Sequence, residues 1–300
     1  MPKDKLQGHI FAIITILFWG TTFISTKVLL LDFTPIEILF FRFVIGFLAL
    51  IFVYPHMLKW TGIGRELLFM CAGITGITFY YLFENIALTM TQTANVSVIV
   101  SASPFFAAII TRLFEKEEKL RAGFFVGFIF AIFGIGLISF SGAKNISINP
   151  KGDLLALLAA AIWAIYSTLA RRISRYGYST VQTTRRTFIY GLVFMLPALF
   201  FFKFDFEPTS LAKPVNLFNI IFLGVGASAL CFVTWNCAIA RLGTVKTIIY
   251  LYAVPVIAII SALIILKEPI SPSVVFGTAL TLAGLFISQF RFRGKVRIST

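Results

Sequence analysis

The sequence predicts an all-α integral membrane protein in which ten transmembrane helices form two inverted five-helix repeats. Three observations lead to this prediction: an apolar composition, ten separate apolar segments, and a register match between the two halves. Of the 300 residues, 59% are hydrophobic and 13% are charged, and the mean hydropathy is +0.94. Soluble globular domains have about 45–50% apolar and about 25% charged residues. A soluble fold could not hide this much apolar surface, so the expected solvent is a lipid bilayer.

The formal charge of +14 has to be explained within the same picture. In a soluble protein it would favour a nucleic-acid partner. Here the Lys and Arg residues stand at the ends of apolar runs, where their side chains can reach the membrane surface. We therefore expect a lipid bilayer and a small-molecule solute as partners, and no nucleic acid.

Cysteine and histidine positions argue against redox, metal and catalytic sites. Cys71, Cys231 and Cys237 all lie in apolar segments without CxxC spacing, which is typical of reduced packing residues. His9 and His56 lie at the ends of spans, and no His/Asp/Glu cluster or glycine-rich phosphate loop has workable spacing. The sequence thus predicts no cofactor, no metal and no enzymatic activity.

Ten segments are long and apolar enough to cross a bilayer, which takes about 20 residues per helix. They cover about 8–30, 35–54, 66–88, 93–114, 122–141, 152–172, 179–202, 216–240, 245–266 and 272–291. Proline, glycine and charged residues mark the junctions between them.

Charge asymmetry between the junctions predicts the orientation. Of the 26 Lys and Arg residues, 17 fall on the side of the N-terminus. The other side holds six, namely Lys27, Lys144, Lys151, Lys203, Lys213 and Lys267. Three more, Arg42, Arg185 and Arg186, lie within helices. Positive residues favour the cytoplasmic side, so both termini are expected there, in the plasma (inner) membrane of a bacterial cell.

The two halves match when one is slid along the other. At an offset of 144, Trp19 meets Trp163 and Arg42 meets Arg186; at 151, Pro104 meets Pro255. Further matches join Gly73 to Gly224, Asn85 to Asn236, Glu117 to Glu268, Gly127 to Gly277 and Gly134 to Gly284. The match predicts a first repeat at 1–141, a linker at 142–151 and a second repeat at 152–300.

An odd number of helices per repeat makes the second repeat enter the membrane from the opposite side. Inverted repeats of this kind are typical of secondary transporters, because rocking the two units opens a central site to each side in turn. A duplicated scaffold without transport activity is the alternative.

Four pairs of motifs resemble those of the drug/metabolite transporter superfamily, specifically EamA-type transporters with two tandem EamA domains. They are Phe18-Trp19-Gly20 with Ile162-Trp163-Ala164; Phe41-Arg42-Phe43 with Arg185-Arg186-Thr187; Ser103-Pro104 and Lys116-Glu117 with Val254-Pro255 and Lys267-Glu268; and Gly127/Gly134 with Gly277/Gly284. The resemblance covers essentially the whole chain. It implies a plasma-membrane carrier, commonly an exporter of amino acids or related metabolites.

Arg42 and Glu84 are the charged residues that the sequence singles out. A charge within the bilayer costs about 2.5–3.5 kcal/mol on insertion scales, so it is rare and usually functional. At 1.5 Å per residue, Arg42 lies about 10 Å and Glu84 about 8–10 Å below the outer surface. Their similar depth therefore allows an ion pair between them. Such a pair is either a gate or proton-coupled site, or a purely structural bridge. The second repeat keeps Arg186, whereas Trp235 stands at the position of Glu84.

Pro104 and Pro255 fall in the middle of spans, where each removes a backbone hydrogen bond and can break the helix. Broken helices at this depth are tolerated where they line a cavity, although a simple packing kink is the alternative. The candidate solute-binding residues are Trp19, Tyr80, Glu84, Ser101, Trp163, Tyr166, Trp235 and Tyr250. Aromatic residues make up 16% of the chain, so packing against lipid is the alternative for each aromatic candidate. The glycines of spans three, five and ten are expected to permit close helix contact.

The sequence therefore predicts a transporter or exporter of amino acids or similar small metabolites that works by alternating access. The alternative is a non-transporting membrane scaffold or sensor. Both a monomer and a homodimer remain open.

Overall fold

The structure, a computed structural model, describes residues 3–115, 122–139, 150–202, 204–205, 207–242, 247 and 250–289. The predicted Lys116-Glu117 motif, most of the predicted linker and the basic C-terminal residues lie outside this part. The described part contains helices and no strands. The helices are α1 (Lys3–Leu29), α2 (Pro35–Val53), α3 (Ile63–Gly73), η1 (Ile74–Phe79), α4 (Tyr80–Met90), α5 (Thr93–Val100), α6 (Ser103–Glu115), α7 (Ala122–Ser139), α8 (Pro150–Ser174), α9 (Thr180–Phe201), α10 (Pro208–Ala212), α11 (Pro214–Ile221), η2 (Phe222–Leu230), α12 (Cys231–Leu242), α14 (Val254–Ser261), η3 (Ala262–Leu266) and α15 (Pro272–Gln289).

Five helical stretches in the described residues are long and apolar enough to cross a membrane. They are Asp4–Leu29, Pro35–Val53, Ile63–Met90, Pro150–Ser174 and Pro214–Ala238. Shorter apolar helices cover Thr93–Ala107, Gly123–Ile138, Val254–Leu266 and Pro272–Ser288. The prediction of an all-helical, multi-pass membrane protein is confirmed, while the count of ten spans stays a prediction.

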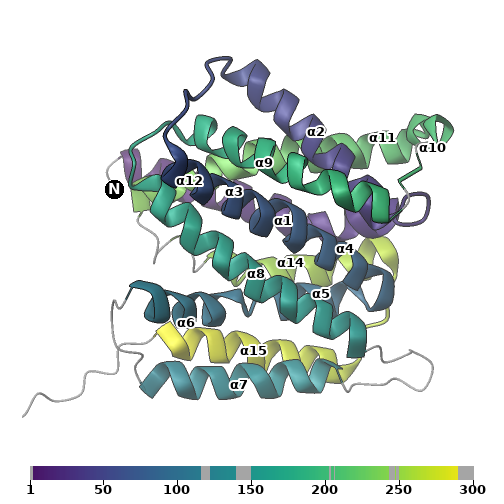
Figure 1. The fold of residues 1–300 in the computed structure, drawn as a ribbon. Coiled ribbons are helices and arrows are strands. Elements are labelled where there is room, and N and C mark those ends of the chain that lie inside the picture. The colour runs from purple at the N-terminus through teal and green to yellow at the C-terminus, as the bar shows by residue number, and fades with distance from the viewer. Residues whose placement is uncertain are drawn as a thin grey trace, which may run out of the picture.

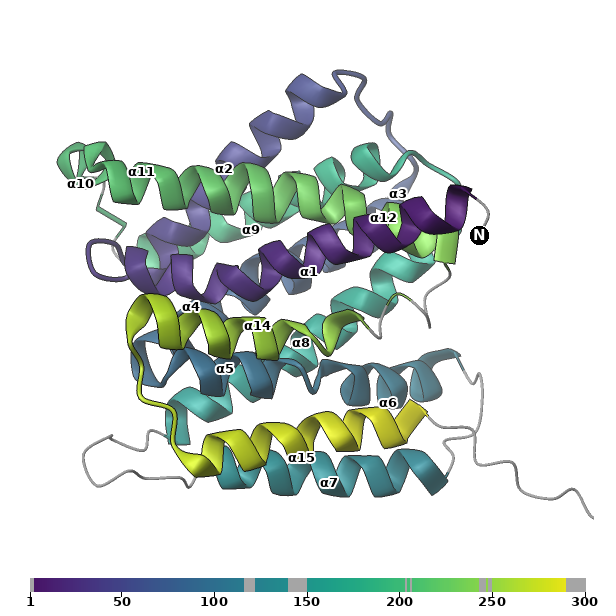
Figure 2. The same cartoon turned by 180° about the vertical axis from the view of Figure 1, so that it is seen from behind.

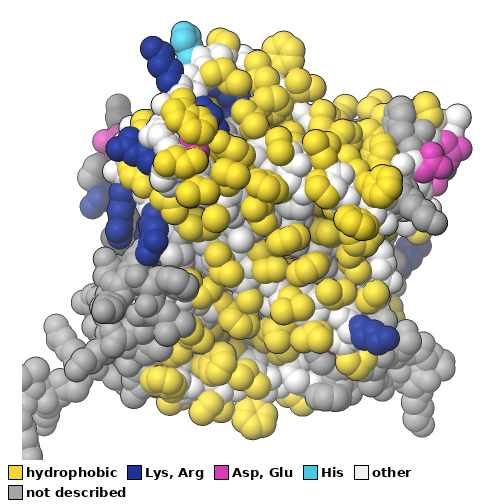
Figure 3. All heavy atoms as spheres, in the orientation of Figure 1, with side chains coloured by type: hydrophobic (Ala, Val, Ile, Leu, Met, Phe, Trp, Pro, Cys, Tyr) yellow, Lys and Arg dark blue, Asp and Glu magenta, His cyan; other side chains and the backbone are white. Residues whose placement is uncertain are grey.

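The surface agrees with a lipid environment. Figure 3 shows a broad face of hydrophobic side chains with charged groups gathered toward its two ends. Many helices expose large apolar side chains. For example, Phe133 is 66% exposed, Phe200 84% and Phe276 70%. Exposed apolar patches larger than a few hundred Å² are rare on soluble monomers, so lipid is the solvent that fits them.

The helices run roughly parallel to one another in a bundle (Figures 1 and 2). The pair α7 and α15 forms one edge, α5 and α6 lie next to it, and α2 lies at the opposite edge. Helices from both halves of the chain alternate in the middle, where α1 packs on α12 and α4 packs on α8. The start of α1 and the connection between α8 and α9 lie at the same end of the bundle.

Local sequence explains where α2 starts. The Thr34 hydroxyl accepts a hydrogen bond from the Glu37 backbone N–H, and the Glu37 carboxylate accepts one from the Thr34 backbone N–H. This capping box satisfies two backbone donors that a helix start leaves free. Pro35 occupies the first turn, where its missing N–H costs nothing.

Reciprocal glycines explain the close packing of α7 on α15. A Cβ on Gly127 would lie 2.3 Å from the Gly284 carbonyl oxygen, and a Cβ on Gly284 would lie 2.4 Å from that of Gly127. Gly134 and Gly277 have the same relation, at 2.5 and 2.6 Å. In a bilayer no hydrophobic driving force holds helices together, so they associate through close packing. Small residues permit that close approach of the backbones.

Two kinds of irregularity occur in the middle of the bundle. The helical run from Thr93 to Glu115 is interrupted at residues 101–102, and residues 252–253 form a turn just before α14. Two π-helical segments, η1 and η2, precede α4 and α12. Such segments add a residue per turn, re-aim the side chains that follow and are frequent at functional sites. Tyr80, Tyr81 and Glu84 come directly after η1.

Candidate functional site

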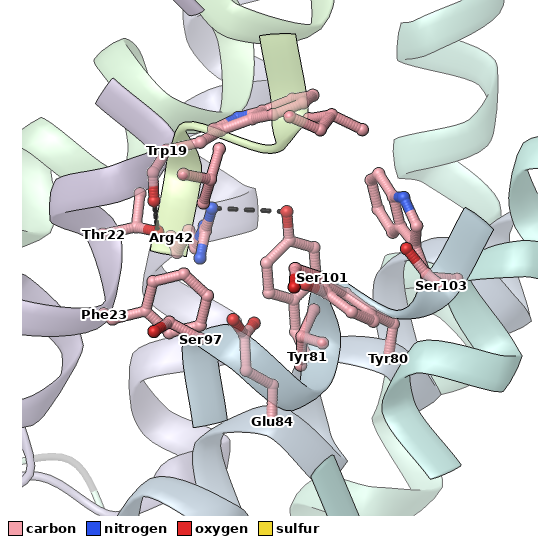
Figure 4. A pocket seen from close by; sticks show the side chains of 14 residues that line it. Trp19, Thr22, Phe23, Arg42, Tyr80, Tyr81, Glu84, Ser97, Ser101 and Ser103 are labelled. Carbon is pink, nitrogen blue, oxygen red and sulfur yellow. Dashed lines mark hydrogen bonds between the residues drawn. The ribbon is translucent and has the colours of Figure 1, made fainter. Parts of the chain in front are cut away.

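A small inner chamber lies at the centre of the bundle and holds both charged residues that the sequence singles out. Its volume is about 70 Å³. Helices α1, α2, α4, α5 and α8 and the residues around the two breaks contribute its lining. The lining residues are Trp19, Thr22, Phe23, Arg42, Tyr80, Tyr81, Glu84, Ser97, Val100, Ser101, Ser103, Trp163, Leu251 and Val254. Figure 4 shows the Arg42 guanidinium and the Glu84 carboxylate reaching into the same space from different helices.

Arg42 is held by uncharged groups. Its Nε donates to the Ser228 hydroxyl at 2.8 Å, and one terminal nitrogen, Nη2, donates weakly to the Tyr81 hydroxyl at 3.4 Å. The guanidinium carbon also lies 4.1 Å from the centroid of the Tyr81 ring, where a cation is attracted to the aromatic face. Ser228 belongs to η2 in the second half of the chain, so this contact joins the two halves.

Glu84 is buried, with 5% of its surface exposed. Among the described residues, no ion pair joins it to Arg42. The two charges face the same chamber, as their matching depth predicts, and the direct ion pair that the sequence left open is not formed among the described residues. Ser228 and Tyr81 hold the guanidinium, and the chamber separates it from the carboxylate.

A larger outer chamber of about 460 Å³ continues from the inner one toward the α8–α9 connection. Trp19, Trp163, Ser103 and Leu251 line both chambers and form the boundary between them. The other lining residues are Pro104, Ala107, Tyr166, Ser167, Thr168, Ala170, Arg171, Ile173, Ser174, Tyr178, Thr180, Thr183, Thr184, Thr187, Phe232, Trp235 and Asn236. A volume of about 300–1,000 Å³ is typical of small-molecule sites.

An aromatic cluster surrounds the boundary. The Trp19 and Trp163 rings meet edge-on, with centroids 6.2 Å apart, and Trp235 lies 5.2 Å from Trp19. Trp163 also contacts Tyr80 at 4.6 Å and Tyr166 at 4.9 Å. We call these five residues the aromatic collar. The Trp19 indole N–H donates to the Ala227 carbonyl at 3.1 Å, which fixes the ring while its apolar faces stay available.

Hydroxyl groups line the outer chamber along one face of α9. They belong to Thr180, Thr183, Thr184 and Thr187, whose spacing places them on a single helical face. A polar stripe facing an aromatic collar offers a solute both hydrogen bonds and apolar contact.

The helix break beside Pro104 lies at the boundary between the chambers. Ser101 lines the inner chamber, Ser103 lines both, and Pro104 lines the outer one. The Ser101 hydroxyl donates to the Val98 carbonyl at 2.6 Å. Pro255 is buried in the first turn of α14 and lines neither chamber, although its neighbour Val254 lines the inner one.

Two further sequence-predicted residues, besides Pro255, lie outside the cavity lining. The Tyr250 hydroxyl is 2.5 Å from His9 Nδ1, and Tyr250 lines neither chamber. Arg186 forms an ion pair with Glu66 at 3.4 Å and also donates to the Leu58 and Lys59 carbonyls. The second repeat has Trp235 at the position of Glu84, and the acid that pairs with Arg186 comes from α3 of the first half.

Two groups of lining residues and one residue that holds Arg42 were missed from the sequence. Tyr81 follows Tyr80, and consecutive residues of a regular helix point about 100° apart, so only one of them was expected to face the cavity. Ser228 stands far from Arg42 in the chain, and no local pattern links them. The threonine stripe on α9 was detectable as a polar helical face. In the part of the chain that the structure describes, no group of three or more His, Cys, Asp or Glu side chains could hold a metal.

Comparison with known proteins bears on this cavity. The model of the EamA-like transporter family matches residues 6–140 and 150–290. A probable terminal-alkyne amino-acid exporter of Streptantibioticus cattleyicolor is 24% identical over 98% of this chain and 97% of its own length. A probable amino-acid metabolite efflux pump of Salmonella typhimurium is 24% identical over 94% of each chain. An uncharacterized transporter of Archaeoglobus fulgidus is 26% identical over 91% of this chain and 95% of its own. One crystal structure shares the fold with a TM-score of 0.67 at 19% identity, covering 94% of this chain and 96% of the other.

Proposed function

Because the chain belongs to the EamA-like transporter family, as its motifs predict, we propose that it moves amino acids or similar small metabolites across the plasma membrane by alternating access. The observation that carries the proposal is the pair of connected chambers in the middle of the bundle. The outer chamber has the volume of a small-molecule site, and its lining combines aromatic faces with a hydroxyl stripe. The names of the two amino-acid exporting relatives support the choice of solute and an outward direction.

Contacts at the far end of the bundle support a closed barrier there. The Lys27 ammonium, from the last turn of α1, donates to the Leu88 carbonyl and to the Thr91 carbonyl, the latter at 3.2 Å. These carbonyls belong to the end of α4, where backbone acceptors lack helical partners. Glu268 accepts hydrogen bonds from the Thr93 hydroxyl at 2.9 Å and from its backbone N–H at 3.4 Å.

Two features favour a barrier that can open. Lys267 adopts a left-handed backbone, with φ of 53°, and so ends η3 and turns the chain just before Glu268. One carboxylate oxygen of Glu268 is buried without a hydrogen-bond partner, which weakens the closed arrangement. An alternating-access carrier needs such a reversible closure on the side opposite its open chamber.

We also propose the finer architecture: ten spans in two inverted repeats, 1–141 and 152–300, joined by a linker at 142–151. The family model matches the chain twice, over ranges close to these. We expect both termini in the cytoplasm, because basic residues favour that side. The orientation of the termini can be measured with a reporter tag at each end of the chain. The tags are probed in intact cells and again after permeabilisation. Access to either tag in intact cells contradicts the proposed orientation.

Solute exchange by purified protein in liposomes tests the proposed function. Liposomes loaded with an unlabelled amino-acid mixture should take up labelled amino acids faster than protein-free liposomes. No exchange of any amino acid or related metabolite, by protein that is folded, would favour a scaffold or sensor instead.

A bulky residue in the inner chamber should stop this exchange. Ser101→Phe places a ring in a space of about 70 Å³, so we expect exchange to fall at least about tenfold. Leu17→Phe is the matched control, because Leu17 lies on α1 and is 52% exposed toward lipid. Normal exchange by Ser101→Phe would remove the inner chamber from the solute's path.

A further inference from the structure

Arg42 is a buried cation that forms no ion pair with any residue that the structure describes. Its exposed fraction is 2%, and its described contacts are to Ser228, Tyr81 and the Phe43 ring. All three are uncharged groups. A buried charge whose partner is missing strongly destabilises a protein. A protein keeps such a charge where it serves a function.

The two arginines of α9 show how this chain satisfies a structural arginine. Arg186 pairs with the Glu66 carboxylate at 3.4 Å. Arg185 donates to the Tyr54 carbonyl at 2.5 Å and to the His56 carbonyl. Arg186 is the counterpart of Arg42 in the repeat, so the two positions have diverged: one holds a loop in place and the other faces a chamber.

The guanidinium of Arg42 has capacity left for a ligand. A guanidinium carries five N–H donors in a planar fork. The contacts above use one donor on Nε and one on Nη2, and Nη1 donates no hydrogen bond within the described part of the chain. Arg42 is one of the residues that line the inner chamber (Figure 4). Hence the free side of the fork faces a space of about 70 Å³, which has room for a headgroup but not for a whole organic solute.

We infer that Arg42 binds the carboxylate of the transported solute in the inner chamber, and that Ser228 is the positioning residue that aims its guanidinium there. This inference rests on the proposed function and assigns an orientation to the solute. A planar guanidinium matches a carboxylate in geometry and charge, and such hydrogen bonds are about twice as strong as neutral ones. The apolar part of the solute then lies among the aromatic collar, and an ammonium group can face Glu84 across the chamber.

Matched pairs of probes test this orientation. L-Leucine and L-phenylalanine are compared with L-leucinamide and L-phenylalaninamide, which keep the size and the ammonium group but lack the carboxylate. In the exchange assay, we expect the wild-type protein to take up each acid with a half-saturation concentration at least about tenfold below that of its amide, since a hydrogen bond to a charged group is worth about 1.5–3 kcal/mol. Equal handling of acids and amides overturns the inference and leaves the proposed function intact. If neither the acids nor the amides are exchanged, this result contradicts the proposed function.

Variants then separate positioning from folding. Ser228→Ala should raise the half-saturation concentration of the acids about tenfold, leave that of the amides unchanged and keep the maximal rate. Arg42→Lys keeps the charge but loses the fork, and should lie between the wild type and Arg42→Gln in its preference for acids. Thr278→Ala is the control, because it removes a buried hydroxyl that bonds the Val274 carbonyl outside both chambers. An equal effect of Ser228→Ala on acids and amides overturns its positioning role. Melting temperature in detergent identifies any variant that fails to fold, and Arg42→Lys then carries the comparison.

Discussion

Replacing Glu84 with glutamine is expected to make transport insensitive to a pH gradient. The neutral side chain keeps the size of the carboxyl group but cannot gain or lose a proton. If Glu84 exchanges one proton per solute, accumulation by the wild type should change about tenfold per unit of pH gradient, because one pH unit is worth about 1.4 kcal/mol. The Glu84→Gln variant should then show no such change. The measurement is solute accumulation in proteoliposomes with an imposed gradient between pH 6 and pH 8.

The structure supports this expectation through what faces Glu84. The ionisable groups that line its chamber are Arg42 from α2 and Tyr80 and Tyr81 from α4, while α1, α5, α8 and the residues at the two breaks contribute none. Glu84 is therefore the carboxyl group of this chamber, and Arg42 does not hold it in an ion pair.

Glu66→Gln is the matched control for Glu84→Gln. Glu66 is another buried acid, but its contacts to Arg186, Tyr190 and Thr61 tie a loop to the bundle. We expect Glu66→Gln to lower the melting temperature and to leave the pH response unchanged. Arg42→Gln distinguishes a structural bridge from a coupling site, because a bridge predicts that Arg42→Gln and Glu84→Gln both destabilise the fold and that neither alters the pH response. An unchanged pH response in Glu84→Gln removes the coupling role.

Adding one methyl group to Gly127 is expected to separate α7 from α15 and to destabilise the fold. The new Cβ would lie 2.3 Å from the Gly284 carbonyl oxygen and 2.8 Å from the Ser288 backbone nitrogen, and neither backbone atom can rotate away. Overpacking of this kind costs about 1–3 kcal/mol and occasionally more. Lower yield of monodisperse protein and a lower melting temperature in detergent are the measurements.

Gly136→Ala provides the control on the same helix. No atom lies within 4 Å of a Cβ built on Gly136. Alanine there should stabilise α7 by about 0.5–1 kcal/mol through helix propensity alone. Equal stability of Gly127→Ala and Gly136→Ala would contradict the close backbone contact between α7 and α15.

The sequence predicts how deep a residue lies along its span. It predicts only in part which side of the helix the residue occupies. Counting residues placed Arg42 and Glu84 at one level, and both line the inner chamber. The repeat placed Trp19 and Trp163 together, and their rings are in contact. Tyr250 was a candidate solute-binding residue, but its hydroxyl contacts His9 on α1 and it lines neither chamber.

The errors have a common physical cause, which is that hydropathy reports depth but not neighbours. Glu66 stands at the start of a span, and hydropathy gives no sign that its side chain is fully buried against Arg186. Ser228 holds Arg42 across 186 residues of chain, and no periodicity carries that information. The π-helical segment η1 rotates α4 relative to the part of the span that precedes it, so counting at 3.6 residues per turn along the whole span could not show which face of α4 turns toward the chamber.

Tryptophan fluorescence of a Trp60→Phe variant tests most directly whether the solute occupies the chambers. The chain has four tryptophans, of which Trp19, Trp163 and Trp235 line the cavity and Trp60 is 66% exposed in a connecting segment. The variant therefore reports on the aromatic collar alone. We predict a saturable fluorescence change with each solute that the protein exchanges in liposomes, with a midpoint that Ser228→Ala shifts only for solutes bearing a carboxylate. A solute that is exchanged at a normal rate while the fluorescence stays constant at saturating concentration would contradict binding in this cavity.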